Sequence, residues 1–377
     1  MNTRLREIRE SVFKGKAGLE EEQLQNLIVQ MNELFIDKEQ YSFLLNDSNI
    51  LILIEILKSI PTAQLSEIIL YELDVKTQFK ICEFIIKKNN DSKEIRLLIH
   101  ELLNLYRYST WMQKISGSKD WENLFAELIE FSNYNYNVLF KQRVRDYSNK
   151  TLFKVIKGDR YEEYSWEKVD KYVQKYSKSL YAIVQDYERV DMDVAFLLEN
   201  SLDMAILDIA SLSTGIRNIM IPANSVSAHI TFILNQTKTP VVIASNEKQL
   251  SKIKSVKNEL AYLKKVVLLS GKSIEDWVIP FNEFLENGLQ TLPDVDIQIN
   301  DLTSLMYTSG TTGDPKGIMF SQMNIVYKRF MRAMALPKIS DRDRYLAFLP
   351  LFHTFGRYLE LSGAVFWGAE YCFMENP

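Results

Sequence analysis

The chain has 377 residues, of which 25% are charged and 46% are hydrophobic, and its formal net charge is -4 at a sequence pI of about 5.7. This length allows two or three domains with a sizeable core, and the acidic balance argues against general nucleic-acid binding, which needs a basic surface. The two cysteines, Cys82 and Cys372, are far apart in sequence, which argues against a disulfide framework and against a cysteine-based zinc site.

The N-terminal residues do not predict a targeting segment. The first twenty residues alternate charges and lack the apolar region of a secretory signal. The strongest apolar run, at 50–57, is too short to span a bilayer and contains Glu55. We therefore expect a soluble, cytoplasmic protein without a transmembrane segment.

Residues 1–118 are expected to form a separate helical domain of unknown role. No glycine occurs between Gly18 and Gly117, and the ranges 19–35 and 74–88 have the spacing of amphipathic helices. Another helix is expected to begin near Pro61. The segment "SGSKD" at 116–120 is the predicted joint, and a helical solenoid remains an open alternative.

From residue 119 onward the pattern predicts an α/β domain. A hairpin is expected at 151–165, with its turn at Gly158, and a helix follows whose apolar residues recur every three or four positions from Trp166. Short apolar runs then alternate with helical patterns. Strands are expected at 194–200, 216–222, 239–245, 264–270 and 302–308, and helices at 201–214 and 225–237. This alternation predicts a largely parallel sheet with helices on both faces, whose ligands lie beyond the carboxyl ends of the strands.

The segment "YTSGTTGDPKG" at 307–317 is the strongest candidate site. Its three glycines let backbone N–H groups approach a ligand closely, and Lys316 adds a positive charge. Hydroxyl donors come from Thr308, Ser309, Thr311 and Thr312. We expect this loop to follow a strand and precede a helix, and to bind a polyphosphate. A threonine hydroxyl is also a ligand that Mg²⁺ accepts. The alternative is an ordinary surface turn.

Three other short patterns do not predict sites. The loop is not a Walker loop, because Pro315 replaces the second glycine, and the "GKS" at 271–273 has Val266 where the first glycine is needed. The segment "HELLN" at 100–104 lacks the second histidine of a zinc site. We therefore expect His100 to be a partly exposed helix residue and His229 to lie on a helix surface.

The loop resembles the phosphate loop of the adenylate-forming superfamily, which includes acyl-CoA synthetases, luciferases and peptide-synthetase adenylation domains. A second segment, "FLPLFHTFGR" at 348–357, resembles the next motif of that family, and the ranges 164–180 and 194–225 resemble its N-terminal subdomain. The resemblance covers about 120–377. Residues 1–118 match no family that we recognise.

The resemblance implies a two-step reaction. A carboxylate attacks the α-phosphorus of MgATP to give an acyl-adenylate and pyrophosphate, and a thiol, usually of coenzyme A, then displaces AMP. Pyrophosphate leaves only if its growing charge is neutralised, which preorganised donors and a metal do. The implied cofactors are ATP, Mg²⁺ and coenzyme A as co-substrate, and Thr311 is the position expected to contact Mg²⁺. The residues expected to bind the nucleotide phosphates are Thr308, Ser309, Gly310, Thr311, Thr312, Gly313, Lys316 and Gly317.

The second motif indicates the class of acid. Family members that activate amino acids carry an aspartate there, whereas this chain has no carboxylate at 353–356. An unpaired ammonium group in an apolar pocket is unfavourable, so we expect a simple carboxylic acid, with a fatty acid as the first candidate. By resemblance His353 closes the acyl pocket; its alternative role is purely structural.

Several family motifs have no match in these 377 residues: the adenine-binding strand with its magnesium glutamate, the ribose-binding aspartate, and the lid with its catalytic lysine. We therefore expect the domain at 119–377 to be truncated before these motifs, to be inactive alone, and to bind a complementing C-terminal segment. Two other hypotheses stay open. One is a non-catalytic remnant that binds nucleotide or a partner; the other, disfavoured by the failed Walker pattern, is a phosphoryl-transfer enzyme.

Overall fold

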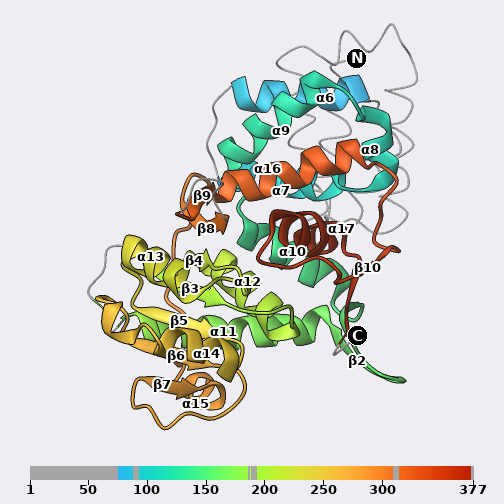
Figure 1. Ribbon diagram of the computed structural model, residues 1–377. Coiled ribbons are helices and arrows are strands. Elements are labelled where there is room, and N and C mark those ends of the chain that lie inside the picture. The colour runs from blue at the N-terminus through green and yellow to red at the C-terminus, as the bar shows by residue number, and fades with distance from the viewer. Residues whose placement is uncertain (1–74, 88–92, 186, 188–192, 309–313, 375–377) are drawn as a thin grey trace, which may run out of the picture. The chain divides into compact units, whose positions relative to one another are not determined.

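The computed structural model describes residues 75–87, 93–185, 187, 193–308 and 314–374 (Figure 1). The chain divides into two compact units. The first comprises residues up to Tyr134 together with Ala333–Lys338, and the second comprises Asn135–Arg332 and Ile339–Pro377. This division lies later in the chain than the joint predicted at 116–120. The helices expected at 19–35 and near Pro61 lie outside the described residues.

The described part of the first unit is helical. Its helices are α6 (Val75–Lys87), α7 (Lys93–Tyr106), α8 (Ser109–Ile115) and α9 (Lys119–Ser132). The helix predicted at 74–88 is therefore confirmed. The segment predicted as a joint instead begins α9, because the Ser118 side chain accepts a hydrogen bond from the Trp121 N–H and caps that helix.

An aromatic cluster forms the core of the first unit. The rings of Tyr106 and Trp111 stack with their centroids 5.2 Å apart, and Trp121 packs edge-on against both. These side chains and Phe125 are at most 3% exposed. Each large ring buries apolar area and adds a favourable ring–ring geometry, so this unit has a hydrophobic core of its own.

The second unit contains a seven-stranded sheet in the order β7-β6-β5-β3-β4-β8-β9. All neighbouring strands are parallel except β8 and β9, which are antiparallel. The strands are β3 (Asp193–Leu197), β4 (Arg217–Met220), β5 (Val241–Ala244), β6 (Lys265–Leu268), β7 (Val278–Pro280), β8 (Leu302–Thr308) and β9 (Lys316–Ser321). The predicted strands and their largely parallel pairing are confirmed.

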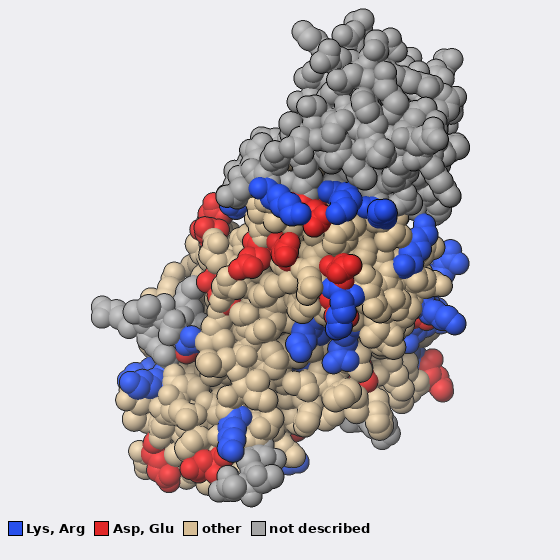
Figure 2. All heavy atoms as spheres, turned by 90° about the horizontal axis from the view of Figure 1, so that it is seen from above, with Lys and Arg blue, Asp and Glu red and all other residues tan. Residues whose placement is uncertain are grey.

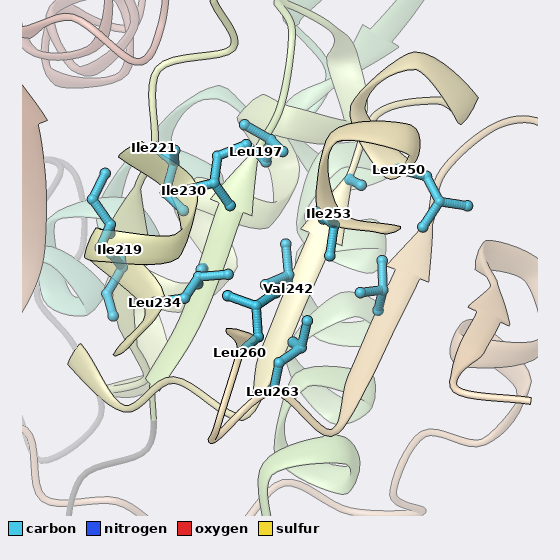
Figure 3. Close-up of a cluster of buried hydrophobic side chains, with 14 of the residues drawn as sticks. Leu197, Ile219, Ile221, Ile230, Leu234, Val242, Leu250, Ile253, Leu260 and Leu263 are labelled. Atoms are coloured by element: carbon cyan, nitrogen blue, oxygen red, sulfur yellow. The ribbon is translucent and has the colours of Figure 1, made fainter. Parts of the chain in front are cut away.

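Helices cover both faces of this sheet, as doubly wound folds require. On one face, α13 (Ser227–Thr237) and α14 (Glu247–Lys254) pack on alternate strand residues such as Leu197, Ile219 and Val242, as Figure 3 shows. On the other, α11 (Trp166–Gln185) and α12 (Leu202–Thr214) contact the sheet at β3, β4 and β8. Further helices of the unit are α10 (Tyr136–Tyr147) and α15 (Phe281–Glu286).

A second, four-stranded sheet has the order β10-β11-β1-β2. Its strands are β1 (Thr151–Lys157), β2 (Arg160–Ser165), β10 (Arg344–Leu346) and β11 (Glu370–Met374). The predicted hairpin is confirmed, since β1 and β2 pair antiparallel and Gly158 adopts a φ of 59° in the turn.

Two more helical segments belong to the C-terminal part. Helix α16 covers Gln322–Ala335. The stretch after "FLPLFH" forms a π-helical turn, η2 (Phe355–Leu361), continued by α17 (Ser362–Trp367). Because the π form is rare and occurs mostly as a single turn, often at functional sites, η2 marks a place where the chain departs from regular helix geometry.

The surface carries charges of both signs. On the face in Figure 2, the described lysine and arginine side chains lie among aspartate and glutamate side chains rather than in one extended basic area. Where the structure is described, no helix combines the length and the apolar character needed to cross a bilayer.

Candidate functional site

A cavity lies at the carboxyl ends of β4 and β8, which are parallel neighbours. The chain leaves β4 toward β5, on the far side of β3, and leaves β8 toward β9 in the opposite direction. The ends of β4 and β8 therefore flank a switch point, where ligands of such sheets bind. The cavity has a volume of about 520 Å³. It is lined by Pro222, Asn224, Ser225, Val226, His229, Ile233, Met306, Tyr307, Thr308, Pro315, Ile318, Phe352, His353 and Thr354.

The candidate phosphate loop joins two antiparallel strands. The prediction that it precedes a helix is wrong, because Lys316–Ser321 forms β9 before α16 begins. In the register of this hairpin, Thr308 pairs with Lys316 and Tyr307 pairs with Gly317. The loop is therefore closed at its base by a strand pair, and both of its ends are fixed to the sheet.

Gly317 lies close to the ring of its cross-strand neighbour Tyr307. A Cβ atom at this position would lie 3.0 Å from Cζ of the Tyr307 ring, closer than ordinary van der Waals contact. The Tyr307 hydroxyl donates a 2.7 Å hydrogen bond to Oε1 of Gln236 on α13, which holds the ring in place. Burial raises the pKa of Tyr307, so the phenol stays protonated as this donor.

The predicted phosphate-binding residues are described only in part. Thr308 lies at the end of β8 and lines the cavity, and Lys316 and Gly317 are exposed on β9. Ser309, Gly310, Thr311, Thr312 and Gly313 lie outside the described residues. The predicted Mg²⁺ contact at Thr311 is therefore among these.

The second motif forms another part of the cavity. We call residues 349–356 the strap. It follows β10 and runs into the first residues of η2, and its members Phe352, His353 and Thr354 line the cavity. His353 is exposed, and its backbone N–H donates to the Pro350 carbonyl. The structure thus brings His353 and Thr308, which are far apart in sequence, to one cavity.

Sequence reasoning missed His229. It was expected on a helix surface, but it lies half-buried on α13 and lines the same cavity as His353. The helix pattern shows which residues of α13 are apolar, but not that its first turns border the ends of β4 and β8. Ser225 and Asn224, which follow β4, line the cavity as well and were also missed.

The donor set at the cavity indicates how a metal could be held. Within the described ranges, no group of three or more histidine, cysteine, aspartate or glutamate residues is arranged to bind a metal ion. The hydroxyl of Thr308 is an oxygen donor, and Mg²⁺ commonly takes only one or two protein ligands with substrate phosphates and water. The site therefore fits a metal that arrives with a phosphate ligand better than a resident one.

Comparison with known proteins gives the family. A family model described as AMP-binding enzyme matches residues 140–377, which is more than half of the chain. The chain is 26% identical over 254 residues to the long-chain-fatty-acid–CoA ligase ACSBG1 of Rattus norvegicus, covering 64% of this chain and 35% of the relative. It is 33% identical over 146 residues to long chain acyl-CoA synthetase 4 of Arabidopsis thaliana, covering 35% of this chain and 22% of the relative. The chain thus spans about a third or less of the length of these relatives.

Solved structures share the fold. A putative long-chain-fatty-acid CoA ligase from Rhodopseudomonas palustris matches with a TM-score of 0.55 at 19% identity, over 64% of this chain and 57% of that chain. The inhibitor-bound N-terminal domain of FACL13 from Mycobacterium tuberculosis matches with a TM-score of 0.53 at 20% identity, over the same shares of the two chains. The mixed α/β part has the fold of the N-terminal domain of adenylate-forming enzymes, and the chain belongs to the family of AMP-binding enzymes.

Proposed function

We propose that this chain binds the polyphosphate of ATP through the loop at 307–317 and takes part in activating a fatty acid, first to its acyl-adenylate and then to its coenzyme A thioester. The observation that carries the proposal is the register of β8 and β9. It closes a loop of glycines and hydroxyl residues with Thr308 opposite Lys316, beside the cavity at the strand ends.

The chemistry of the loop suits a leaving pyrophosphate. Backbone N–H groups at glycines and the hydroxyl groups at 308–312 are neutral donors, and Lys316 adds a compact positive charge. Fixed donors of this kind stabilise charge that develops on the phosphate oxygens without reorganising during the reaction. Because Thr308 and Lys316 lie opposite each other on paired strands, the backbone positions of these two residues are fixed before the ligand arrives.

Magnesium would enter with the nucleotide. The hydroxyl of Thr308, and by resemblance that of Thr311, would hold it together with phosphate oxygens. When bound, the metal neutralises phosphate charge and acts as a Lewis acid at the phosphoryl oxygens. Lys316 and the loop's backbone donors would orient the outer phosphates around it.

The lining of the cavity favours a simple carboxylic acid over an amino acid. Side chains such as Val226, Ile233 and Phe352 are apolar, and no aspartate or glutamate occurs among the described lining residues. An ammonium group would have no anionic partner there, and burying it unpaired is unfavourable. His229 and His353 give the cavity two polar groups that suit a carboxylate, and about 520 Å³ lies within the range of small-molecule sites.

The test is binding of magnesium pyrophosphate by calorimetry. We expect the 377-residue chain to bind it, and Lys316→Ala to bind at least about tenfold more weakly, since a charge-assisted contact contributes about 1.5–3 kcal/mol. The control is Lys248→Ala, which removes an exposed lysine on α14 outside the cavity. Equal affinities of wild type and Lys316→Ala would contradict the proposal, and absence of binding would favour the non-catalytic remnant.

A further inference from the structure

The strap at 349–356 has little apolar support of its own. Only Leu351 and Gly356 among its residues are buried, and Phe355 is 56% exposed. A segment with few buried apolar contacts is expected to move unless polar contacts hold it. The contacts that fix Phe352 and His353 at the cavity therefore determine the shape of the cavity wall that the strap forms.

Asn200 holds the beginning of the strap. This residue lies just past the carboxyl end of β3, and its Nδ2 donates to the Leu349 carbonyl at 2.8 Å. Its Oδ1 accepts from the Leu351 N–H, also at 2.8 Å. One side chain thus satisfies a backbone acceptor and a backbone donor two residues apart, and it fixes both the position and the orientation of the strap.

The two ends of the strap lie against each other. A Cβ atom on Gly356 would lie 2.4 Å from the Pro350 carbonyl oxygen and 2.7 Å from that of Leu349, so only glycine fits this position. The Arg357 N–H also donates to the His353 carbonyl at 2.9 Å. The beginning and the end of the strap are therefore in direct contact.

Arg357 holds the other end from inside the protein. Its guanidinium is fully buried, and all five of its N–H donors have partners. Nε and Nη2 both donate to the Asp208 carboxylate on α12, at 2.9 Å and 2.5 Å, and Nη2 also donates to Oδ1 of Asn218 on β4 at 2.9 Å. Nη1 donates to the hydroxyl groups of Ser304 on β8 at 2.6 Å and of Tyr358 at 3.0 Å.

Two of the partners of Arg357 lie on β4 and β8, the strands whose carboxyl ends border the cavity. Asn218 and Ser304 are register partners in the β4–β8 pair, and the Ser304 hydroxyl donates to Oδ1 of Asn218 at 2.6 Å. Four residues beyond Ser304, β8 ends at Thr308 in the cavity. The polar cluster of Arg357, Asn218 and Ser304 thus connects the end of the strap to β4 and β8.

We propose that Asn200 and Arg357 are positioning residues that set the distance between the strap wall, at Phe352 and His353, and the strand ends at β4 and β8. In this way they determine how the acid fits. The nature of the ligand rests on the proposed function, but the positioning itself does not. Neither Asn200 nor Arg357 is one of the described residues that line the cavity, so both act through the strap.

Two variants test this role. Asn200→Ala removes the exposed anchor and leaves no buried charge, so it is expected to fold. Arg357→Lys keeps a positive charge beside Asp208 but has three donors instead of five. The control is Asn246→Ala at the carboxyl end of β5, where the side chain caps α14 and makes no bond to the strap.

The position of the strap is read from histidine NMR signals, which need no activity. The chain has three histidines, so labelling at Cε1 gives three resonances, which are assigned with His353→Gln and His100→Gln. We expect the His353 signal to shift in both anchor variants and to stay at its wild-type position in Asn246→Ala, while the His100 signal stays unchanged throughout. A His353 signal at the wild-type position in both anchor variants would overturn the proposal.

Calorimetry with sodium dodecanoate and with magnesium pyrophosphate gives the second measurement. Losing two hydrogen bonds at Asn200 should weaken dodecanoate binding about tenfold, with the affinity for pyrophosphate unchanged within about twofold. Parallel loss of both affinities would overturn the proposal, because it would indicate general loosening. If the wild-type chain binds neither probe, the proposed function fails, and the NMR comparison still decides the role of the anchors.

Discussion

Replacing Asp208 by asparagine should destabilise the second unit strongly. Asp208 is 2% exposed and accepts hydrogen bonds from two nitrogens of Arg357 and from Nδ2 of Asn218. The change keeps the side-chain shape but removes the charge, so the buried guanidinium loses its counter-ion and meets a donor instead of an acceptor. Removing one partner of a buried ion pair costs about 3–5 kcal/mol, a large part of a typical stability of about 5–15 kcal/mol.

A matched control separates burial from the mere loss of an ion pair. Asp193 pairs with Arg217 through two bonds of 2.6 and 2.7 Å, so its geometry resembles that of the Asp208–Arg357 pair. However, the Arg217 side chain is 17% exposed and that of Arg357 is 0% exposed. Water can partly solvate Arg217 after Asp193→Asn, and we expect a smaller loss of about 1.5–3 kcal/mol.

The measurement is the free energy of unfolding from urea titrations of the wild type and both variants. Hydrogen exchange of peptides from α12 and η2 identifies the unit that is affected. Asp208→Asn should lose clearly more stability than Asp193→Asn, with faster exchange in both peptides. Equal losses in the two variants, or a loss below about 1 kcal/mol for Asp208→Asn, would refute the reasoning that the Arg357 charge depends on its carboxylate partner.

Three further predictions concern single side chains. Burial lowers the pKa of His100 below 6.5, so the folded state binds this proton less readily than the unfolded chain. The stability of the first unit should therefore fall as the pH drops below about 6.5. In thermal melts at pH 7 and pH 5, His100→Gln should show a smaller loss of stability than the wild type. Burial raises the pKa of Cys82 to about 12 and that of Cys372 to about 11. Both thiols should therefore react with Ellman's reagent far more slowly in the native chain than in urea. A fast reaction in the native chain would contradict their burial. Gly317→Ala should displace the Tyr307 ring and weaken pyrophosphate binding about two- to tenfold by calorimetry, whereas unchanged affinity would show that this close contact does not shape the loop.

The fold of the second unit could be predicted from sequence because its signals are local. The apolar runs predicted as strands at 239–245 and 264–270 contain β5 and β6, since strands buried on both faces are rich in consecutive apolar residues. The prediction of a helix directly after the phosphate loop was wrong because β9 is a strand of only six residues, most of which are exposed. Such an edge strand has no periodic apolar pattern to distinguish it from a loop or a first helical turn.

The candidate site was only partly predictable because much of it depends on contacts between distant residues. The loop at 307–317 and His353 were found through motifs. Arg357 gave no signal, since arginine is rarely buried and its partner Asp208 lies 149 residues earlier in the chain. Asn200 reaches Leu349 across the same sequence separation of 149 residues. These contacts form only in the folded chain, between residues that no local pattern connects.

The two halves of the proposed site therefore depend on different kinds of support. The two ends of the proposed phosphate loop lie on the neighbouring strands β8 and β9, and its candidate donors are within a few residues of each other in sequence. The strap wall at Phe352 and His353 is held by side chains that lie far away in sequence. Substitutions in the loop should change phosphate affinity while the strap keeps its position, and substitutions at Asn200 should do the reverse. A relative with the same loop but different anchors would then keep its nucleotide chemistry and accept a different acid.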